Sequence, residues 1–101
     1  MSIPLPDPMN PRDTRAAIAR GELVLDRKVP LPPPEWGEFR RERMIPAIKA
    51  AIYFCNGRTL YQVRAYVKLP HYLSRQRIQQ YVDKGVKFLW DRGCFRATTP
   101  T

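Results

Sequence analysis

The sequence predicts a mainly helical domain with a small β-hairpin at its C-terminal end, preceded by a proline-rich arm. Three observations support this prediction. Eight of the 11 prolines fall within residues 1–34. Between positions 35 and 85 the apolar residues recur at intervals of three and four, and after Gly85 the interval changes to two. We therefore divide the 101 residues into an arm, residues 1–34, and a folded domain, residues 35–101.

The arm begins with MSIPLPDPMNP, which cannot sustain a helix or a central strand because each proline removes a donor and restricts its predecessor. We expect this segment to be extended or disordered. NPRDTRAAIARG predicts a short helix, with Asn10 as N-cap, Pro11 in the first helical position and Gly21 as the stop. ELVLDRKV predicts a short strand. PLPPPEW is expected to be a stiff spacer of polyproline type, or alternatively a ligand for an aromatic groove.

The first helix of the domain is predicted within WGEFRRERMIPAIKAAIYFCNG. One stripe at helical spacing contains Ile45, Ile48, Ala51, Ile52 and Cys55. Pro46 should kink this helix or mark a fresh start, and Asn56-Gly57 should end it.

The second helix is predicted within RTLYQVRAYVKLP, with Thr59 as N-cap and Leu60, Val63 and Val67 on its inner side. A turn, PHYL, follows. The third helix is predicted within SRQRIQQYVDKG, where Ser74 begins the helix and Gly85 ends it. Its inward positions are Ile78, Tyr81 and Val82.

After Gly85 the sequence predicts two short strands. VKFLW alternates in β fashion, DRG suits a three-residue bulged turn, and CFRAT suits the returning strand. One continuous helix over residues 74–92 is the alternative. Gly85 and the β-rich composition of VKFLW argue against that alternative.

This order of helix, helix, turn, helix and hairpin resembles a winged helix-turn-helix domain over about residues 42–99. The resemblance depends on spacing: Val63 in the second helix, Ser74 eleven residues later, Ile78 and Tyr81 on the inner side, then Gly85 and the hairpin. It implies that the third helix enters the major groove of DNA with its N-terminal part near the bases. The first 34 residues lie outside the resemblance.

The third helix carries side chains that pair well with base edges. Arg suits guanine and Gln suits adenine, each good pair discriminating by about 1–3 kcal/mol. A simple solvated face would usually contain more acidic residues than the single Asp83 found here. The residues expected to contact bases are Arg75, Gln76, Gln79 and Gln80.

The formal charge of +9 favours a polyanionic partner, and residues 35–101 hold 13 basic and five acidic side chains. Cations of the second helix, the third helix and the wing are expected to contact phosphates. The residues expected to contact the DNA backbone are Arg58, Arg64, Lys68, Ser74, Arg77, Lys87, Arg92 and Arg96. About six such contacts would give a slope of affinity against salt near −5 on logarithmic axes.

Other functional classes have less support in the sequence. Two cysteines and one histidine do not make a zinc site, and no catalytic motif is present, so we expect no metal, no cofactor and no enzyme activity. Both cysteines are expected to be small buried hydrophobes. We see no signal peptide and no run of about 20 apolar residues, which favours the cytoplasm, beside the nucleoid, and no membrane partner.

The aromatic residues could stack on single-stranded bases, but we expect them to be packed in the core instead. This group comprises Tyr53, Phe54, Phe88, Trp90 and Phe95. In contrast, His71 and Tyr72 in the turn are expected to be exposed.

The sequence therefore predicts a sequence-specific duplex-DNA-binding protein, foremost a small transcription regulator of the size and charge typical of phages and mobile elements. A homodimer through the arm is expected, since most such target sites are two-fold symmetric. The first alternative is a protein-interaction module in a nucleoprotein assembly, docking through the arm and a face around Trp36, Phe39 and Leu89. The second alternative is RNA binding.

Overall fold

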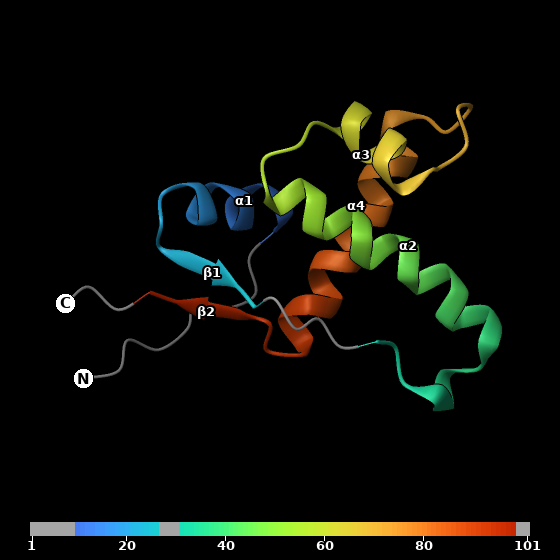
Figure 1. Ribbon diagram of the computed structural model, residues 1–101, viewed down its shortest axis with the longest axis horizontal. Coiled ribbons are helices and arrows are strands. Elements are labelled where there is room, and N and C mark those ends of the chain that lie inside the picture. Colours follow the sequence, from blue (N-terminus) through green and yellow to red (C-terminus); the bar gives the residue numbers. More distant parts are fainter. Residues whose placement is uncertain (1–9, 27–30, 99–101) are drawn as a thin grey trace.

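The computed structural model describes residues 10–26 and 31–98, and within them the chain is mainly helical, as predicted (Figure 1). The N-terminal segment 1–9 and part of the expected spacer, residues 27–30, lie outside the described residues. The elements in chain order are α1 (Pro11–Ala19), β1 (Leu23–Leu25), the 3-10 turn η1 (Pro34–Trp36), α2 (Glu38–Cys55), α3 (Leu60–Val67), α4 (Arg75–Asp91) and β2 (Phe95–Ala97).

Helix α1 has the caps that its sequence predicts. The Asn10 side chain accepts a hydrogen bond from the Asp13 N–H at 2.8 Å, and Pro11 occupies the first helical position. Gly21, just beyond the C-cap, has a φ of 76°, a left-handed conformation that glycine adopts at little cost. The expected short strand follows as β1.

Helix α2 runs without interruption from Glu38 to Cys55, so Pro46 does not mark a fresh start. Proline lacks one backbone N–H donor, and the helix continues on both sides of it. Its buried residues are Ala47, Ile48, Ala50, Ala51, Phe54 and Cys55. The buried face is wider than the predicted stripe, because α1, α3 and α4 all pack against α2.

Helix α4 continues through Gly85 and Trp90 to Asp91, so the predicted wing is wrong: residues 86–90 are helical. Gly85 does not stop the helix but allows α2 and α4 to approach closely. A Cβ atom at Gly85 would lie 2.7 Å from the Cβ of Ala51 and nearer still to the backbone of Ala47. The apolar residues of VKFLW are compatible with a helix here because α2 and α1 both pack against this part of α4.

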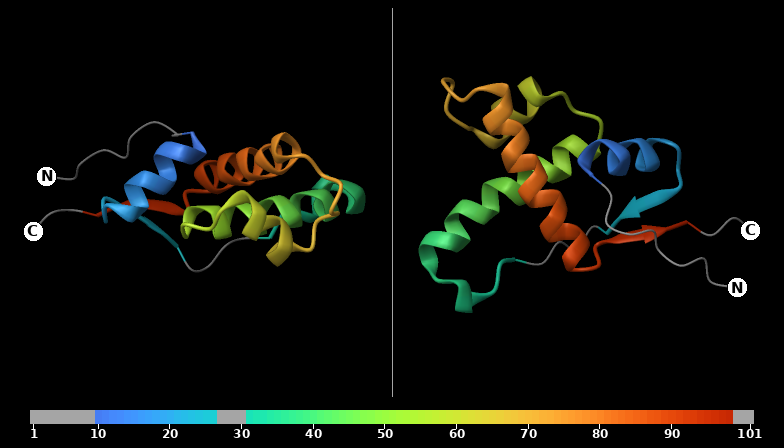
Figure 2. Two further views of the ribbon diagram at one scale, coloured as in Figure 1. Left: turned by 90° about the horizontal axis from the view of Figure 1, so that it is seen from above. Right: turned by 180° about the vertical axis from the view of Figure 1, so that it is seen from behind.

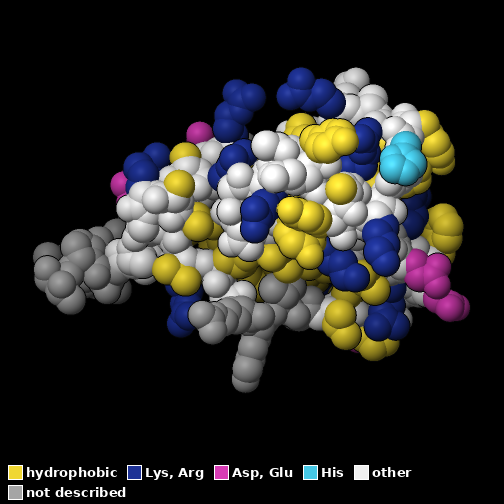
Figure 3. Space-filling view, turned by 45° about the horizontal axis from the view of Figure 1, so that its top comes forward, with side chains coloured by type: hydrophobic (Ala, Val, Ile, Leu, Met, Phe, Trp, Pro, Cys, Tyr) yellow, Lys and Arg dark blue, Asp and Glu magenta, His cyan; other side chains and the backbone are white. Residues whose placement is uncertain are grey.

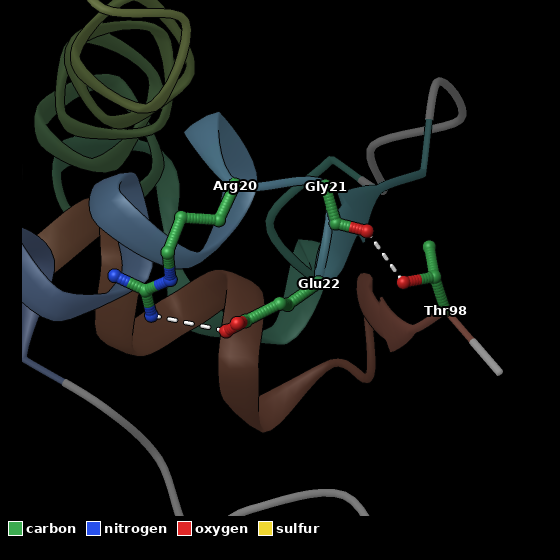
Figure 4. A network of polar contacts seen from close by, with 4 residues as sticks. All are labelled: Arg20, Gly21, Glu22 and Thr98. Carbon is green, nitrogen blue, oxygen red and sulfur yellow. Dashed lines mark hydrogen bonds and ion pairs between the residues drawn. The ribbon is translucent and has the colours of Figure 1, made fainter. Parts of the chain in front are cut away.

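The second predicted strand exists as β2, but its partner is β1 rather than residues 86–90. The two strands are antiparallel, with Leu23 opposite Ala97 and Leu25 opposite Phe95. At the end of this sheet the Thr98 hydroxyl donates to the Gly21 carbonyl, and an exposed ion pair joins Arg20 to Glu22 at 3.0 Å (Figure 4). The strand predicted within CFRAT therefore pairs with β1, a strand of the arm, and is not part of a wing.

The elements lie in two layers, with α2 and α3 in one and α1 and α4 in the other (Figure 2). One hydrophobic core joins them and includes Ala17 of α1 and Leu23 of β1. The Trp90 indole N–H donates to the Thr14 hydroxyl at 3.1 Å, which fastens α4 to α1. Residues 10–26 of the arm thus share the core of the residues beyond position 34, and the expected division at that position does not separate two packing units.

The core contains the aromatic residues that the sequence assigned to it. Phe54, Phe88 and Phe95 are buried, and Tyr53 and Trp90 pack partly buried against them. Cys55 and Cys94 are free and buried, as expected of small hydrophobes.

Candidate nucleic-acid interface

The first turn of α4 presents two cations at a helix N-terminus. The Ser74 hydroxyl accepts a hydrogen bond from the Arg77 N–H at 3.2 Å and so caps the helix. Arg75, Gln76 and Arg77 are all exposed, and this turn contains no acidic residue. Arginines here oppose the helix dipole, which is positive at this end. Arg75 and Arg77 are therefore poorly placed for stabilising the helix and well placed for binding an anion.

The next turn separates its inner and outer sides as the spacing predicts. Ile78 and Val82 are buried, whereas Gln80 is exposed. Gln79 differs from expectation, because it is half-buried and its amide N–H donates to the Asp83 carboxylate at 2.9 Å. Three of the four residues expected to contact bases therefore project freely, and the fourth is held by an acid.

Helix α3 lies beside this part of α4 and carries its own cations. A capping box joins Thr59 and Gln62 at its start. The Arg64 guanidinium donates to the His71 carbonyl at 3.2 Å and stacks over the Tyr61 ring, 4.9 Å from the centroid. Arg64 thereby ties α3 to the turn that precedes α4.

Two hollows lie beside α3, one shared with the start of α4 and one with the turn between the two helices. The first, of about 200 Å³, is lined by Thr59, Leu60, Tyr61, Arg64, Leu73, Arg75 and Ile78. The second, of about 300 Å³, is lined by Tyr61, Arg64, Ala65, Lys68, Leu69 and His71. Tyr61 and Arg64 line both hollows, and Figure 3 shows Lys and Arg side chains interleaved with hydrophobic ones near the histidine. Tyr61 and Tyr72 are 72% and 87% exposed, the latter as expected for the turn.

Two of the predicted backbone contacts, Arg92 and Arg96, are not brought to this surface, and Lys87 reaches only the hollow that it shares with Arg77 and Gln80. Lys87 is exposed near the far end of α4, Arg92 is its C-cap, and Arg96 is on β2. A helix of 17 residues is about 25 Å long, which separates Arg92 from Arg75 by roughly that distance. Because residues 86–90 are helical, these residues do not form a wing. Arg58, in contrast, is exposed just before α3, with its guanidinium 5.7 Å from the Tyr66 ring centroid.

The structure adds two cations that the sequence analysis missed. Arg43 of α2 and Lys84 of α4 line a hollow of about 410 Å³ together with Arg77, Gln80, Tyr81, Asp83 and Lys87. Lys84 could have been found from the helical spacing of 77, 80 and 84, because it lies before Gly85 within the predicted third helix. No pattern in the sequence places Arg43 beside α4.

Among the described residues no cation of this surface forms an ion pair, although Asp83 lies beside Arg77 and Lys84 in the same hollow. Among residues 10–26 and 31–98 the structure contains one ion pair, Arg20–Glu22. This pair is at the sheet and far along the chain from α3 and α4. Unpaired cations near one another raise the local positive potential, and such a potential attracts a polyanion.

One expected docking residue is inaccessible, because Leu89 is completely buried, while Phe39 is 73% exposed and Trp36 is half-buried. No helix among the described residues has the length and apolar character needed to cross a membrane. Within the same residues, no three His, Cys, Asp or Glu side chains are grouped closely enough to hold a metal ion. No protein-family model, curated protein or solved structure matches the chain.

Proposed function

We propose that the protein binds duplex DNA with sequence preference and acts as a small transcription regulator, using the N-terminal half of α4. The observation that supports this most strongly is the exposure of Arg75, Gln76, Arg77 and Gln80 on two turns that contain no acid. These side-chain types are the ones that pair with guanine and adenine edges. Their exposed arc is backed by the buried Ile78, which holds the helix rigidly to the core.

In this proposal the start of α4 lies in the major groove, as a recognition helix does in helix-turn-helix proteins. Arg75, Gln76 and Gln80 contact base edges, and Ser74 and Arg77 contact phosphate. Gln79 can contact a base only after its amide leaves Asp83, a single exposed hydrogen bond at 2.9 Å. We therefore expect Gln79 to contribute less discrimination than Gln76 or Gln80.

The cations around α3 hold the duplex in place. Arg58, Arg64 and Lys68 flank the start of α4 together with Arg77, which makes about four phosphate-neutralising groups. The logarithm of duplex affinity should then fall with the logarithm of salt concentration at a slope near −3.6, about −0.9 for each phosphate contact.

The test is fluorescence anisotropy with labelled duplex DNA, single-stranded DNA and RNA at several salt concentrations, after selection of preferred duplexes from a random pool. The double variant Gln76→Ala/Gln80→Ala should bind the selected duplex about tenfold or more weaker, while its affinity for a random duplex changes little. Equal losses on both duplexes would mean that the two glutamines contact backbone. Preference for RNA or single strands would contradict the proposal.

A matched pair of arginine variants tests where the DNA lies. Arg75→Ala should weaken binding to every duplex and reduce its preference for the selected site. Arg96→Ala removes the same charge from β2, at the other end of the molecule from the start of α4, and should leave binding nearly unchanged. If Arg96→Ala weakens binding as much as Arg75→Ala, the DNA occupies a different surface.

The selected sequences also test the expected homodimer. A palindromic consensus with half-sites about 34–36 Å apart would require two copies of α4 related by a two-fold axis. Because β1 pairs with β2 of its own chain, dimerisation by exchange of this strand would require that sheet to open. Sedimentation with and without duplex measures whether a dimer forms before or upon binding.

A further inference from the structure

A second surface lies at the other half of α4, where the start of α2 crosses it. A hollow of about 420 Å³ lies where these helices meet, and we call it the Trp36 hollow. Apolar groups from Trp36, Met44 and Phe88 line it. The cations that line it are Arg40, Arg43, Lys84 and Lys87, against the single carboxylate of Asp91. The site is thus an apolar depression surrounded by four positive charges.

The aromatic groups of the hollow are held in fixed positions. The Trp36 ring meets the Phe88 ring edge to face, with centroids 5.7 Å apart. Phe88 is buried in the core, so it anchors Trp36 from below. Phe39, at the edge of the hollow, is 73% exposed. An exposed phenylalanine beside a preformed apolar depression gains free energy when a partner covers it.

We propose that the Trp36 hollow docks an acidic segment of a partner protein that carries a large apolar side chain among its carboxylates. The apolar side chain enters the depression against Phe39 and Met44. The surrounding carboxylates pair with Arg40, Arg43, Lys84 and Lys87, and arginine can do so in bidentate fashion. This complementarity of both charge and shape is what an acidic amphipathic segment offers.

The same hollow fits nucleic acid less well. The Arg40 guanidinium covers the Trp36 ring at 4.1 Å from its centroid, and the Arg43 guanidinium lies 5.5 Å from the Phe39 centroid. One face of the Trp36 ring is therefore covered by the protein's own cation and is not free to stack on a base, which single-strand binding requires. A phosphodiester backbone would satisfy the cations but has no apolar group to fill the depression.

This proposal does not depend on DNA binding. The Trp36 hollow is lined by α4 residues between positions 84 and 91, whereas Arg75, Gln76 and Gln80 are at positions 75–80. The neighbouring hollow of about 410 Å³, which includes Arg77 and Gln80, connects the two regions.

The test uses short labelled peptides and fluorescence anisotropy on the full-length protein. The first peptide is rich in glutamate around a central phenylalanine. In the second, serine replaces the phenylalanine, and in the third, glutamine replaces every glutamate. We expect the first peptide to bind and each of the other two to bind about tenfold weaker or worse. No binding of the first peptide, or equal binding of the first and either other peptide, would overturn the proposal.

Two variants locate the site on the protein. Phe39→Ser removes an exposed aromatic side chain, and the double variant Lys84→Gln/Lys87→Gln removes two of the charges that line the hollow. Each should lower the affinity for the first peptide about fivefold to tenfold. Lys49→Gln, at an exposed position of α2 outside the hollow, is the charge control and should leave binding unchanged. Circular dichroism checks that all three remain folded. If the variants lower the affinity for a labelled single-stranded oligonucleotide and leave the affinity for the peptide unchanged, the surface binds nucleic acid and the proposal fails.

Discussion

The close crossing of α2 and α4 predicts that Gly85→Ala destabilises the fold. In an ordinary helix this change would stabilise by about 1 kcal/mol, because alanine has the higher helix propensity. Here the added methyl would lie 2.7 Å from the Cβ of Ala51 and nearer to the backbone of Ala47, so the two helices must move apart. Overpacking of a core costs about 1–3 kcal/mol, and a clash with backbone belongs at the upper end of that range.

The net loss should therefore be about 2 kcal/mol, the overpacking of about 3 less the propensity gain of about 1. For a domain of this size it lowers the melting temperature by about 10 °C. Urea unfolding followed by circular dichroism measures the loss. A variant more stable than the original protein would show that the helices do not meet at Gly85.

A double variant separates this clash from a general effect of residue 85. Combining Gly85→Ala with Ala51→Gly removes one of the contacting atoms, so the two losses should be less than additive by at least about 0.5 kcal/mol. Ala65→Gly, at an exposed position of α3, is the control and should be additive with Gly85→Ala. Full additivity with Ala51→Gly would contradict the proximity of the two residues.

Three further predictions concern the caps, the docking of α1 and the buried thiol. Thr59→Ala removes the capping box with Gln62 and should cost about 1 kcal/mol in urea unfolding, whereas a change within about 0.3 kcal/mol would mean that the box contributes nothing. Thr14→Val leaves the Trp90 indole N–H without its 3.1 Å acceptor and should cost about 1–3 kcal/mol, and it should alter tryptophan fluorescence; an unchanged spectrum and stability would indicate that α1 is not docked there. Burial raises the pKa of the Cys55 thiol from its ordinary 9.0 to about 12. The unfolded chain therefore loses this proton first, so stability should fall as the pH rises from about 9 to about 12, and Cys55→Ala should lack that part of the slope when unfolding is measured across this range.

Local signals made most of the helices predictable from the sequence. Asn10, Thr59 and Ser74 each cap a helix, because their short polar side chains satisfy backbone N–H groups that a helix start leaves free. The inward positions Val63 and Ile78 follow from helical spacing and are buried. These features depend on residues within a few positions of one another, which a single sequence displays directly.

Residues 86–90 and the partner of β2 were mispredicted because their determinants are distant in the sequence. Glycine suits both a helix end and a close helix crossing, and only the position of Ala47 and Ala51 on α2 decides between them at Gly85. The partner of β2 is β1, close to the other end of the described chain, and nothing local indicates this pairing. The alternation in VKFLW was equally compatible with a helix that is covered on more than one side.

The candidate interface was predictable to the same extent. Exposure of Arg75, Gln76 and Gln80 follows from the helical period alone, and they keep the positions that the sequence analysis expects. The bond from Gln79 to Asp83 connects residues four apart and could have been anticipated from their spacing. The approach of Arg43 to Lys84 could not, because it arises from the crossing of two helices.

The most direct test of the proposed function is an NMR titration of isotopically labelled protein with duplex DNA. Backbone amide shifts should change most over residues 74–80 and around α3, with little change on β1 and β2. Changes concentrated on the two strands and the C-terminal end of α4, or no change at concentrations where anisotropy detects binding, would contradict the claim that the exposed start of α4 contacts the duplex.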